Sequence, residues 1–245
     1  MASPMFSTFT SVEILTPGQC EEISSAVHML RGFWTQVHAE TLFFTLGVAS
    51  YIEFCRPGDA AARYREKALQ SNPILKEYFR GMMDYLRVTL ERQLGEPVAF
   101  EEEFARPGFH IWLDEAIPTQ PTASVHFDLQ YQRLGWPADG AADYETPISY
   151  TLPVKLPAGG GGMNVWNLHY REVEEMCARG VPVDINVLRE EREREHYEYG
   201  LGRLVIHSGH FLHQIAPVGR VEPGDERITL QGHALRRGGR WLLYW

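Results

Sequence analysis

The spacing of hydrophobic residues changes near residue 97, and this change constrains the fold more than any other feature of the sequence. Before it, Ile23, Val27 and Leu30 recur at helical spacing after a helix-start pattern at residues 16–19. After it, short β-prone runs alternate with glycine and proline. Many short strands separated by turns are typical of closed or sandwiched antiparallel sheets, so we expect an α+β protein rather than one built from βαβ units.

Two further helices are expected in the first part of the chain. One should cover residues 59–70, and the next should begin at Asn72–Pro73 and end before Gly95 and Pro97. We interpret residues 1–97 as a mainly helical support region and residues 98–245 as the β core, both within one compact domain. The strands are expected at residues 98–104, 109–113, 124–132, 148–153, 163–168, 203–207, 211–216, 227–234 and 241–244.

The segment 190–199, EEREREHYEY, is densely charged. Such a run is typical of a solvated helix, so we interpret it as part of an insertion around residues 170–200. Because that insertion lies between core strands, residues 173–199 are also a candidate lid.

Composition limits the classes of partner. The chain has 245 residues, of which 44% are hydrophobic and 22% charged, as in globular proteins with a sizeable core. Its 23 basic and 32 acidic residues give a net charge of −9, which argues against nucleic-acid binding. The stretch 41–52 is too short to span a bilayer, so no membrane partner is expected. Cys20, Cys55 and Cys177 form no CxxC pair, and we interpret them as reduced thiols of a cytoplasmic protein.

The first chemical motif is His126-Phe127-Asp128. Residues i and i+2 of a strand share a face, so the imidazole and the carboxylate would point the same way, with Val125, Phe127 and Leu129 on the other side. Two such side chains are candidate metal ligands. The alternative is a chance pair joined by a surface hydrogen bond.

The second motif holds three histidines, at residues 207, 210 and 213. A third ligand from a separate strand would complete a facial set of two histidines and one carboxylate, which leaves coordination positions open. His213 stands in an apolar β-run that ends in Pro217-Val218, and we therefore assign it to the metal. His207 and His210 flank Ser208-Gly209 and are interpreted as turn or wall residues.

The third motif is Arg227-Ile228-Thr229, where Arg227 and Thr229 share a strand face. A guanidinium can bind a carboxylate through two parallel hydrogen bonds, and a neighbouring hydroxyl can assist. Arg220 is a weaker candidate because it lies in a loop and lacks a hydroxyl two residues on. The alternative for Arg227 is a surface position on an edge strand.

With these three motifs in this order, the sequence resembles the Fe(II)/2-oxoglutarate-dependent dioxygenases, in their prolyl-hydroxylase-like branch. The resemblance covers residues 98–240 and includes the glycine-rich turn 159–162 before Met163-Asn-Val-Trp166. It implies a double-stranded β-helix core, of the jelly-roll or cupin-like type, with the N-terminal helices packed against it.

The resemblance also implies cofactors and roles. Iron(II) would be held by His126, Asp128 and His213, and O2 would be the oxidant. The co-substrate 2-oxoglutarate would be anchored by Arg227 and Thr229, with Tyr150 as a second contact. Related halogenases carry a small residue at the carboxylate position, so Asp128 favours hydroxylation, or a related desaturation or cyclisation, over chlorination.

The substrate is expected to be a small organic metabolite, such as an amino acid derivative or a natural-product intermediate. Alternatives are oxidation of a protein or peptide side chain, a cupin-like oxygenase without 2-oxoglutarate, and a non-catalytic metal-binding protein. Structural zinc fits poorly, since it usually has four protein ligands. The oligomeric state is open. Candidate pocket residues are Phe109, Trp112, Tyr131, Asn164, Trp166, His169 and His210.

Overall fold

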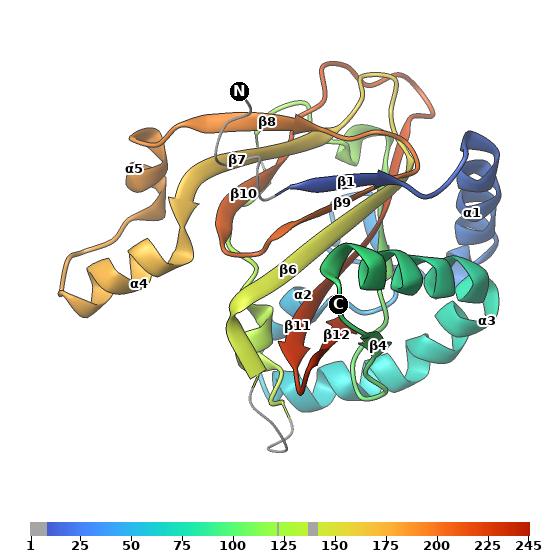
Figure 1. Cartoon of the computed structure of the whole chain (residues 1–245). Helices are drawn as coiled ribbons and strands as arrows, with labels where there is room; N and C mark the ends of the chain where they lie inside the picture. The colour runs from blue at the N-terminus through green and yellow to red at the C-terminus, as the bar shows by residue number, and fades with distance from the viewer. Residues whose placement is uncertain (1–8, 122, 137–141) are drawn as a thin grey trace.

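The computed structural model of the chain describes residues 9–121, 123–136 and 142–245, and it contains two β-sheets that face each other (Figure 1). The large sheet has the strand order β1-β9-β6-β11-β5-β3-β2, with β12 paired to β11 and β4 paired to β12. Its strands are β1 (Thr10–Glu13), β2 (Thr35–Gln36), β3 (Phe43–Leu46), β4 (Val98–Phe100), β5 (Gly108–Leu113), β6 (Ala142–Lys155), β9 (Arg203–Ser208), β11 (Glu226–Arg237) and β12 (Arg240–Tyr244).

The small sheet has the order β10-β7-β8, from Phe211–Ala216, Gly162–His169 and Arg194–Glu198. An isolated antiparallel bridge between His126 and His213 adds the segment around residue 126 to its β10 edge. Two opposed antiparallel sheets in this arrangement form a double-stranded β-helix, so the expected α+β fold class is confirmed.

Helices α1 (Pro17–Met29) and α3 (Ala60–Leu94) cover the large sheet on the side away from the small sheet (Figure 1). The expected cap of α1 is present, with Thr16 and Gln19 forming a capping box. The break expected between two helices at residues 70–72 was wrongly placed: α3 continues through Pro73, and two helical segments meet at a kink at Phe79, where the backbone leaves helical geometry. Tyr64 and Ala68, before the proline, are buried in one hydrophobic cluster, and Leu75 and Phe79, after it, are buried in another. Tertiary packing on both sides of the proline therefore outweighs the lost hydrogen bond.

The charged run 190–199 is not a solvated helix. Helix α5 (Ile185–Glu190) ends where the run begins, and β8 (Arg194–Glu198) pairs with β7 over Glu198↔Gly162 to Arg194↔Trp166. Only α4 (Tyr170–Ala178) and α5 project beyond the end of the small sheet (Figure 1). The N-terminal region supplies β1, β2 and β3 to the large sheet as well as its helices, and the boundary at residue 97 stays a prediction. Among the described residues, no helix is both long and apolar enough to cross a membrane.

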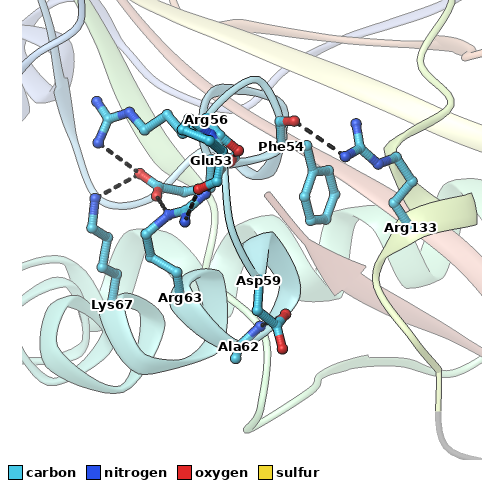
Figure 2. A network of polar contacts seen from close by, with 9 residues as sticks. Glu53, Phe54, Arg56, Asp59, Ala62, Arg63, Lys67 and Arg133 are labelled. Carbon is cyan, nitrogen blue, oxygen red and sulfur yellow. Dashed lines mark hydrogen bonds and ion pairs between the residues drawn. The ribbon is translucent and has the colours of Figure 1, made fainter.

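Helix α2 (Ser50–Phe54) braces the loop that follows residue 128. Arg133, in the 3-10 turn Gln130–Arg133, donates a hydrogen bond of 3.1 Å to the Phe54 carbonyl (Figure 2). On the other side of α2, the buried Glu53 carboxylate meets Lys67 Nζ at 2.7 Å and Arg63 Nε at 2.9 Å, both from α3 (Figure 2). These contacts fix α2 between α3 and the residues that carry the site.

We expect Glu53→Gln to lower the free energy of unfolding by about 1.5–3 kcal/mol at neutral pH, because its hydrogen bonds are charge-assisted. Burial by itself raises the pKa of Glu53, but the hydrogen bonds from Lys67 and Arg63 outweigh it, and the net pKa is lowered. A lowered folded-state pKa gives stability that is present above the unfolded value of about 4.3 and is lost as the pH falls through the folded value. The gap in Tm between wild type and variant should therefore close on acidification. A gap that stays constant down to pH 3 would contradict this, and Glu91→Gln, in an exposed pair with Arg87, is the matched control.

Candidate metal centre and its surroundings

Three side chains from two separate chain segments meet between the sheets. His126, Asp128 and His213 each offer one ligand atom, and these atoms lie within 4.8 Å of one another. His213 comes from β10, and the mutual backbone hydrogen bonds of the bridge, both 3.0 Å, hold His126 beside it. In the described part of the chain this is the one such group of histidine, cysteine and acidic residues.

Backbone carbonyls orient both imidazoles. His126 Nδ1 lies 3.0 Å from the Ser124 carbonyl, and His213 Nδ1 lies 2.8 Å from the Phe211 carbonyl. A carbonyl only accepts, so each Nδ1 carries the proton and donates. Each Nε2 is thereby left to face the carboxylate, which is how ligating histidines are usually prepared for a metal.

The Asp128 carboxylate is the charged centre of the group. The Asp128 side chain is 7% exposed, and its Oδ2 lies 3.3 Å from His213 Nε2. Burial by itself raises the pKa of Asp128, but His213 and His233 lower it, and the net pKa lies well below the usual range. Burial by itself lowers the pKa of His213, but the contact with Asp128 outweighs it, and the net pKa of His213 is raised. The carboxylate therefore stays ionised.

This donor set fits a divalent transition metal. Two imidazole Nε2 atoms and one carboxylate match the facial set of two histidines and one carboxylate, in which the three protein ligands occupy one face of the metal and the other coordination positions stay open. The ligand types suit iron(II), and a fourth protein ligand, which structural zinc would need, is not offered by the described residues. His126 has a side chain exposed by 41%, against 7% for Asp128 and 8% for His213, so the site is accessible from the side of His126.

A continuous strand over residues 124–132 was a wrong expectation. The segment makes only the bridge at His126 and one further backbone bond, from Asp128 N to the Gly209 carbonyl, before the 3-10 turn begins at Gln130. The two bonds still keep it extended, so His126 and Asp128 share a side. Val125 and Phe127 point the other way, into a hydrophobic cluster with Trp166.

Along the strands of the large sheet, apolar side chains on one face pack against the helices, and polar side chains on the other face point into the space between the sheets. On β11, Ile228 and Leu230 join the hydrophobic core beneath the helices, so Arg227 and Thr229 face the small sheet. Buried polar groups need partners, and a polar lining therefore marks this space as a site rather than an ordinary core. The other buried polar residues on this inner face include Thr45, His110, Ser149, Thr151, His207 and His233.

Arg227 belongs to this lining, and it is 1% exposed. Its Nη2 donates to the Gly162 carbonyl at 3.2 Å, whereas Nη1 is buried without a hydrogen-bond partner among the described residues. A buried cationic donor without a partner is costly, and a carboxylate would satisfy it. Arg220, by contrast, has a side chain exposed by 70%, so the structure favours Arg227 as the anion anchor.

Tyr150 does not share the inner face. It is registered opposite Gly232 on β11, and its hydroxyl would lie 2.3 Å from a Cβ added at that glycine. The tyrosine therefore packs on the helix side of β6 within the hydrophobic core, and its placement as a second contact beside Arg227 was wrong. The reason is strand parity, since Tyr150 alternates with the inward Ser149 and Thr151.

Tyr199 occupies the place expected for Tyr150. Its ring centroid lies 5.6 Å from Arg227 Cζ, and its side chain is hydrogen-bonded to Thr151. Burial raises the pKa of Tyr199, so the phenol stays protonated and can donate. This residue was not predicted from the sequence, because it lies at the end of the charged run. The tyrosines at positions 197 and 199 were a signal for a strand, since they are two residues apart.

The expected pocket residues divide between the two sides of the sheets. Trp112 is registered opposite Arg227 on the inner face and stacks on Phe43 with centroids 3.8 Å apart. Tyr131 and His210 are joined by a hydrogen bond of 2.7 Å close to the chain at Gly209, and His169 contacts His210. Their part in substrate binding stays a prediction.

The placement of Asn164 and Trp166 in the pocket was wrong, because β7 presents them on the outer face. Val165 is registered opposite His213 and points inward, so its neighbours at 164 and 166 point outward. Asn164 meets His196 there, and Trp166 packs in a cluster with Val173 below α4 and α5. Phe109 also lies outside the pocket, in the core beneath the helices.

Comparisons with known proteins come from structure alone. No protein-family model matches the sequence, and a search of curated proteins finds no match. Among solved structures, an N-substituted L-amino acid dioxygenase from Burkholderia ambifaria AMMD aligns with a TM-score of 0.62 and 15% identity over 97% of this chain and 86% of that one. The same enzyme in complex with α-ketoglutarate aligns with a TM-score of 0.55, 15% identity and the same coverage.

A third solved structure, an oxidoreductase of the 2OG-Fe(II) oxygenase family from Burkholderia pseudomallei, aligns with a TM-score of 0.50 and 12% identity over 95% of this chain and 86% of that one. Identities this low establish the fold, and the prolyl-hydroxylase-like branch stays a prediction. We conclude that the chain has the double-stranded β-helix fold of the Fe(II)/2-oxoglutarate-dependent oxygenases.

Proposed function

We propose that the protein is an Fe(II)- and 2-oxoglutarate-dependent oxygenase that hydroxylates a small organic molecule. One observation carries the proposal: the facial group of His126, Asp128 and His213 lies between the two sheets, and the buried Arg227, whose Nη1 has no described partner, faces the same space from β11. A metal site of this kind is found in many classes of protein. A metal site together with a buried arginine that can bind a carboxylate fits a 2-oxo diacid, with one end on the metal and the other on the arginine.

The residues of the site have separable tasks. His126, Asp128 and His213 would hold iron(II), which with 2-oxoglutarate and O2 supplies the oxidant for inserting an oxygen atom. Arg227, with Thr229 and Tyr199, would bind the distal carboxylate and so fix the orientation of the co-substrate. Asp128 supplies a carboxylate at the third ligand position, which favours hydroxylation over halogenation.

A small substrate, such as an amino acid derivative, fits the accessible side of the site. His126 is the exposed ligand, so substrate would enter on its side, past Tyr131 and His210. Trp112 lies beside Arg227 and would limit the depth of the site. The solved structure with the TM-score of 0.62 is named as acting on N-substituted L-amino acids, which supports this class as the first to test.

The proposal is tested by incubating iron-loaded protein with 2-oxoglutarate, O2 and either a panel of N-substituted amino acids or a panel of peptides. We expect succinate release to rise with an amino acid derivative, together with a product heavier by one oxygen atom. Stimulation by peptides alone would favour the alternative of a protein side-chain oxygenase. Metal binding without 2-oxoglutarate consumption under any condition would favour the non-catalytic binding protein.

A pair of tyrosine variants tests the arrangement around Arg227. We expect Tyr199→Phe to raise the KM for 2-oxoglutarate about tenfold, because it removes one donor to an anion. Tyr150→Phe should leave that KM unchanged and should not lower Tm, since its buried hydroxyl has no partner among the described residues. Steady-state kinetics at saturating substrate give both values. The reverse order of effects would mean that Tyr150, not Tyr199, faces the co-substrate.

A further inference from the structure

A row of directly opposite residues crosses four strands of the large sheet beneath the candidate metal centre. Ser149 on β6 is registered with His207 on β9 and with His233 on β11, and His233 is registered with Tyr244 on β12. Directly opposite residues share a sheet face, so the row lines the inner side. All four side chains are buried.

The middle of this row reaches the metal-binding carboxylate. Ser149 Oγ donates to Asp128 Oδ2 at 2.6 Å, and His233 Nδ1 lies 3.0 Å from the same Ser149 Oγ. A hydroxyl has a single proton, and the carboxylate can only accept it. His233 Nδ1 must therefore be the donor to Ser149. The hydrogen bonds run in one direction, from His233 to Ser149 to Asp128.

The opposite oxygen and the backbone of Asp128 are held as well. Gln130 Nε2 donates to Asp128 Oδ1 at 3.1 Å, and Asp128 N donates to the Gly209 carbonyl at 2.9 Å. A Cβ at residue 209 would lie 3.1 Å from both Asp128 Cβ and Ser149 Oγ. Glycine at this turn lets the carboxylate approach the sheet closely enough for the serine to reach it.

We propose that Ser149 and His233 are positioning residues for the metal ligand Asp128. They act by fixing the rotation of the carboxylate about its Cβ–Cγ bond before a metal arrives. This preorganisation of a ligating carboxylate sets the affinity of the site for its metal. The inference rests on the proposed function only in requiring that the site binds a divalent metal.

The test is an anaerobic titration of apo-protein with Co(II), without 2-oxoglutarate, followed by the visible ligand-field spectrum. Ser149→Ala should raise the Kd for Co(II) about 10- to 100-fold, the usual effect of losing an outer partner of a ligand. His233→Leu should raise it less, and His233→Asn, which keeps an N–H near the Nδ1 position, should restore most of the wild-type affinity. Ser24→Ala removes the same atom from a buried serine of α1 and is the matched control.

Two further measurements distinguish a positioning role from a general loss of folding stability. If His233 acts through Ser149, His233→Leu should have no further effect on the Kd in the Ser149→Ala background. The Tm of each apo-variant reports folding independently of the metal. Wild-type Co(II) binding with unchanged affinity and spectrum in Ser149→Ala would overturn the positioning role alone. No Co(II) binding by the wild-type protein would overturn it together with the proposed function.

Discussion

His213→Ala is expected to abolish metal binding and, with it, turnover. The side chain is 8% exposed, its Nδ1 donates to the Phe211 carbonyl, and its Nε2 faces Asp128 at 3.3 Å. Loss of an outer partner of a ligand costs about 10- to 100-fold in affinity, and loss of a ligand itself should exceed that. The Kd for Fe(II) or Co(II), measured by anaerobic titration, gives the result without dependence on a known substrate.

His207→Ala is the matched control for this prediction. His207 is another buried imidazole, on β9, with its ring centroid 5.3 Å from that of His213, but it is not part of the metal-binding group. Its replacement should leave the metal Kd nearly unchanged. If His207→Ala loses the metal and His213→Ala keeps it, the ligand assignment is wrong.

Arg227→Lys is expected to raise the KM for 2-oxoglutarate about 10- to 100-fold while leaving the metal Kd unchanged. Lysine keeps the positive charge but loses the planar fork that bonds a carboxylate at two points. Hydrogen bonds to charged groups contribute about 1.5–3 kcal/mol, which corresponds to that range. Because the interaction is one of binding, much of kcat should return at saturating 2-oxoglutarate.

Arg220→Lys provides the control, since Arg220 lies in an exposed loop and pairs with Glu222 at 3.2 Å. It should leave the KM for 2-oxoglutarate unchanged. A raised KM in Arg220→Lys with no change in Arg227→Lys would show that Arg220 binds 2-oxoglutarate. It would contradict the assignment of the buried Arg227 Nη1 to the carboxylate.

The central arrangement could be predicted because it depends on strand parity within short motifs. His126 and Asp128 are two residues apart, as are Arg227 and Thr229, and each pair does share a side. The strands on which the assignment of His213 and Arg227 depended also lie close to the expected ranges. Alternation along one strand is enough to place such a pair, because two residues that are two positions apart must share a face, and both types of side chain are needed at the site.

Other residues could not be placed, because alternation does not say which face of a strand is the inner one. On β6 and β7 both faces carry aromatic or polar residues, so Tyr150 and Trp166 looked as suitable as their neighbours. Only the pairing of β6 with β11, and of β7 with β10, shows that these two point to the helix side and to α4 and α5. The charged run concealed β8 for a related reason: Tyr197, in the strand, and Tyr199, just after it, are separated by the exposed Glu198.

The remaining differences between the predicted and the observed structure result from contacts between residues that are far apart in the sequence. Pro73 marks a helix boundary by local rules, yet α3 continues through it. The reason is that α3 has side chains buried in hydrophobic clusters both before and after the proline. The hydrogen bonds that join His233, Ser149 and Asp128 could not be predicted either, since they depend on the register of β6 with β11, which are far apart in the sequence.

The most direct test of the account is an anaerobic titration of apo-protein with Fe(II) and then with 2-oxoglutarate, followed by visible absorption. We expect a weak metal-to-ligand charge-transfer band that requires both additions and is absent from His213→Ala. A protein that binds Fe(II) yet shows no such band with 2-oxoglutarate would contradict the account, because Arg227 and the metal centre would then not hold the two ends of one molecule.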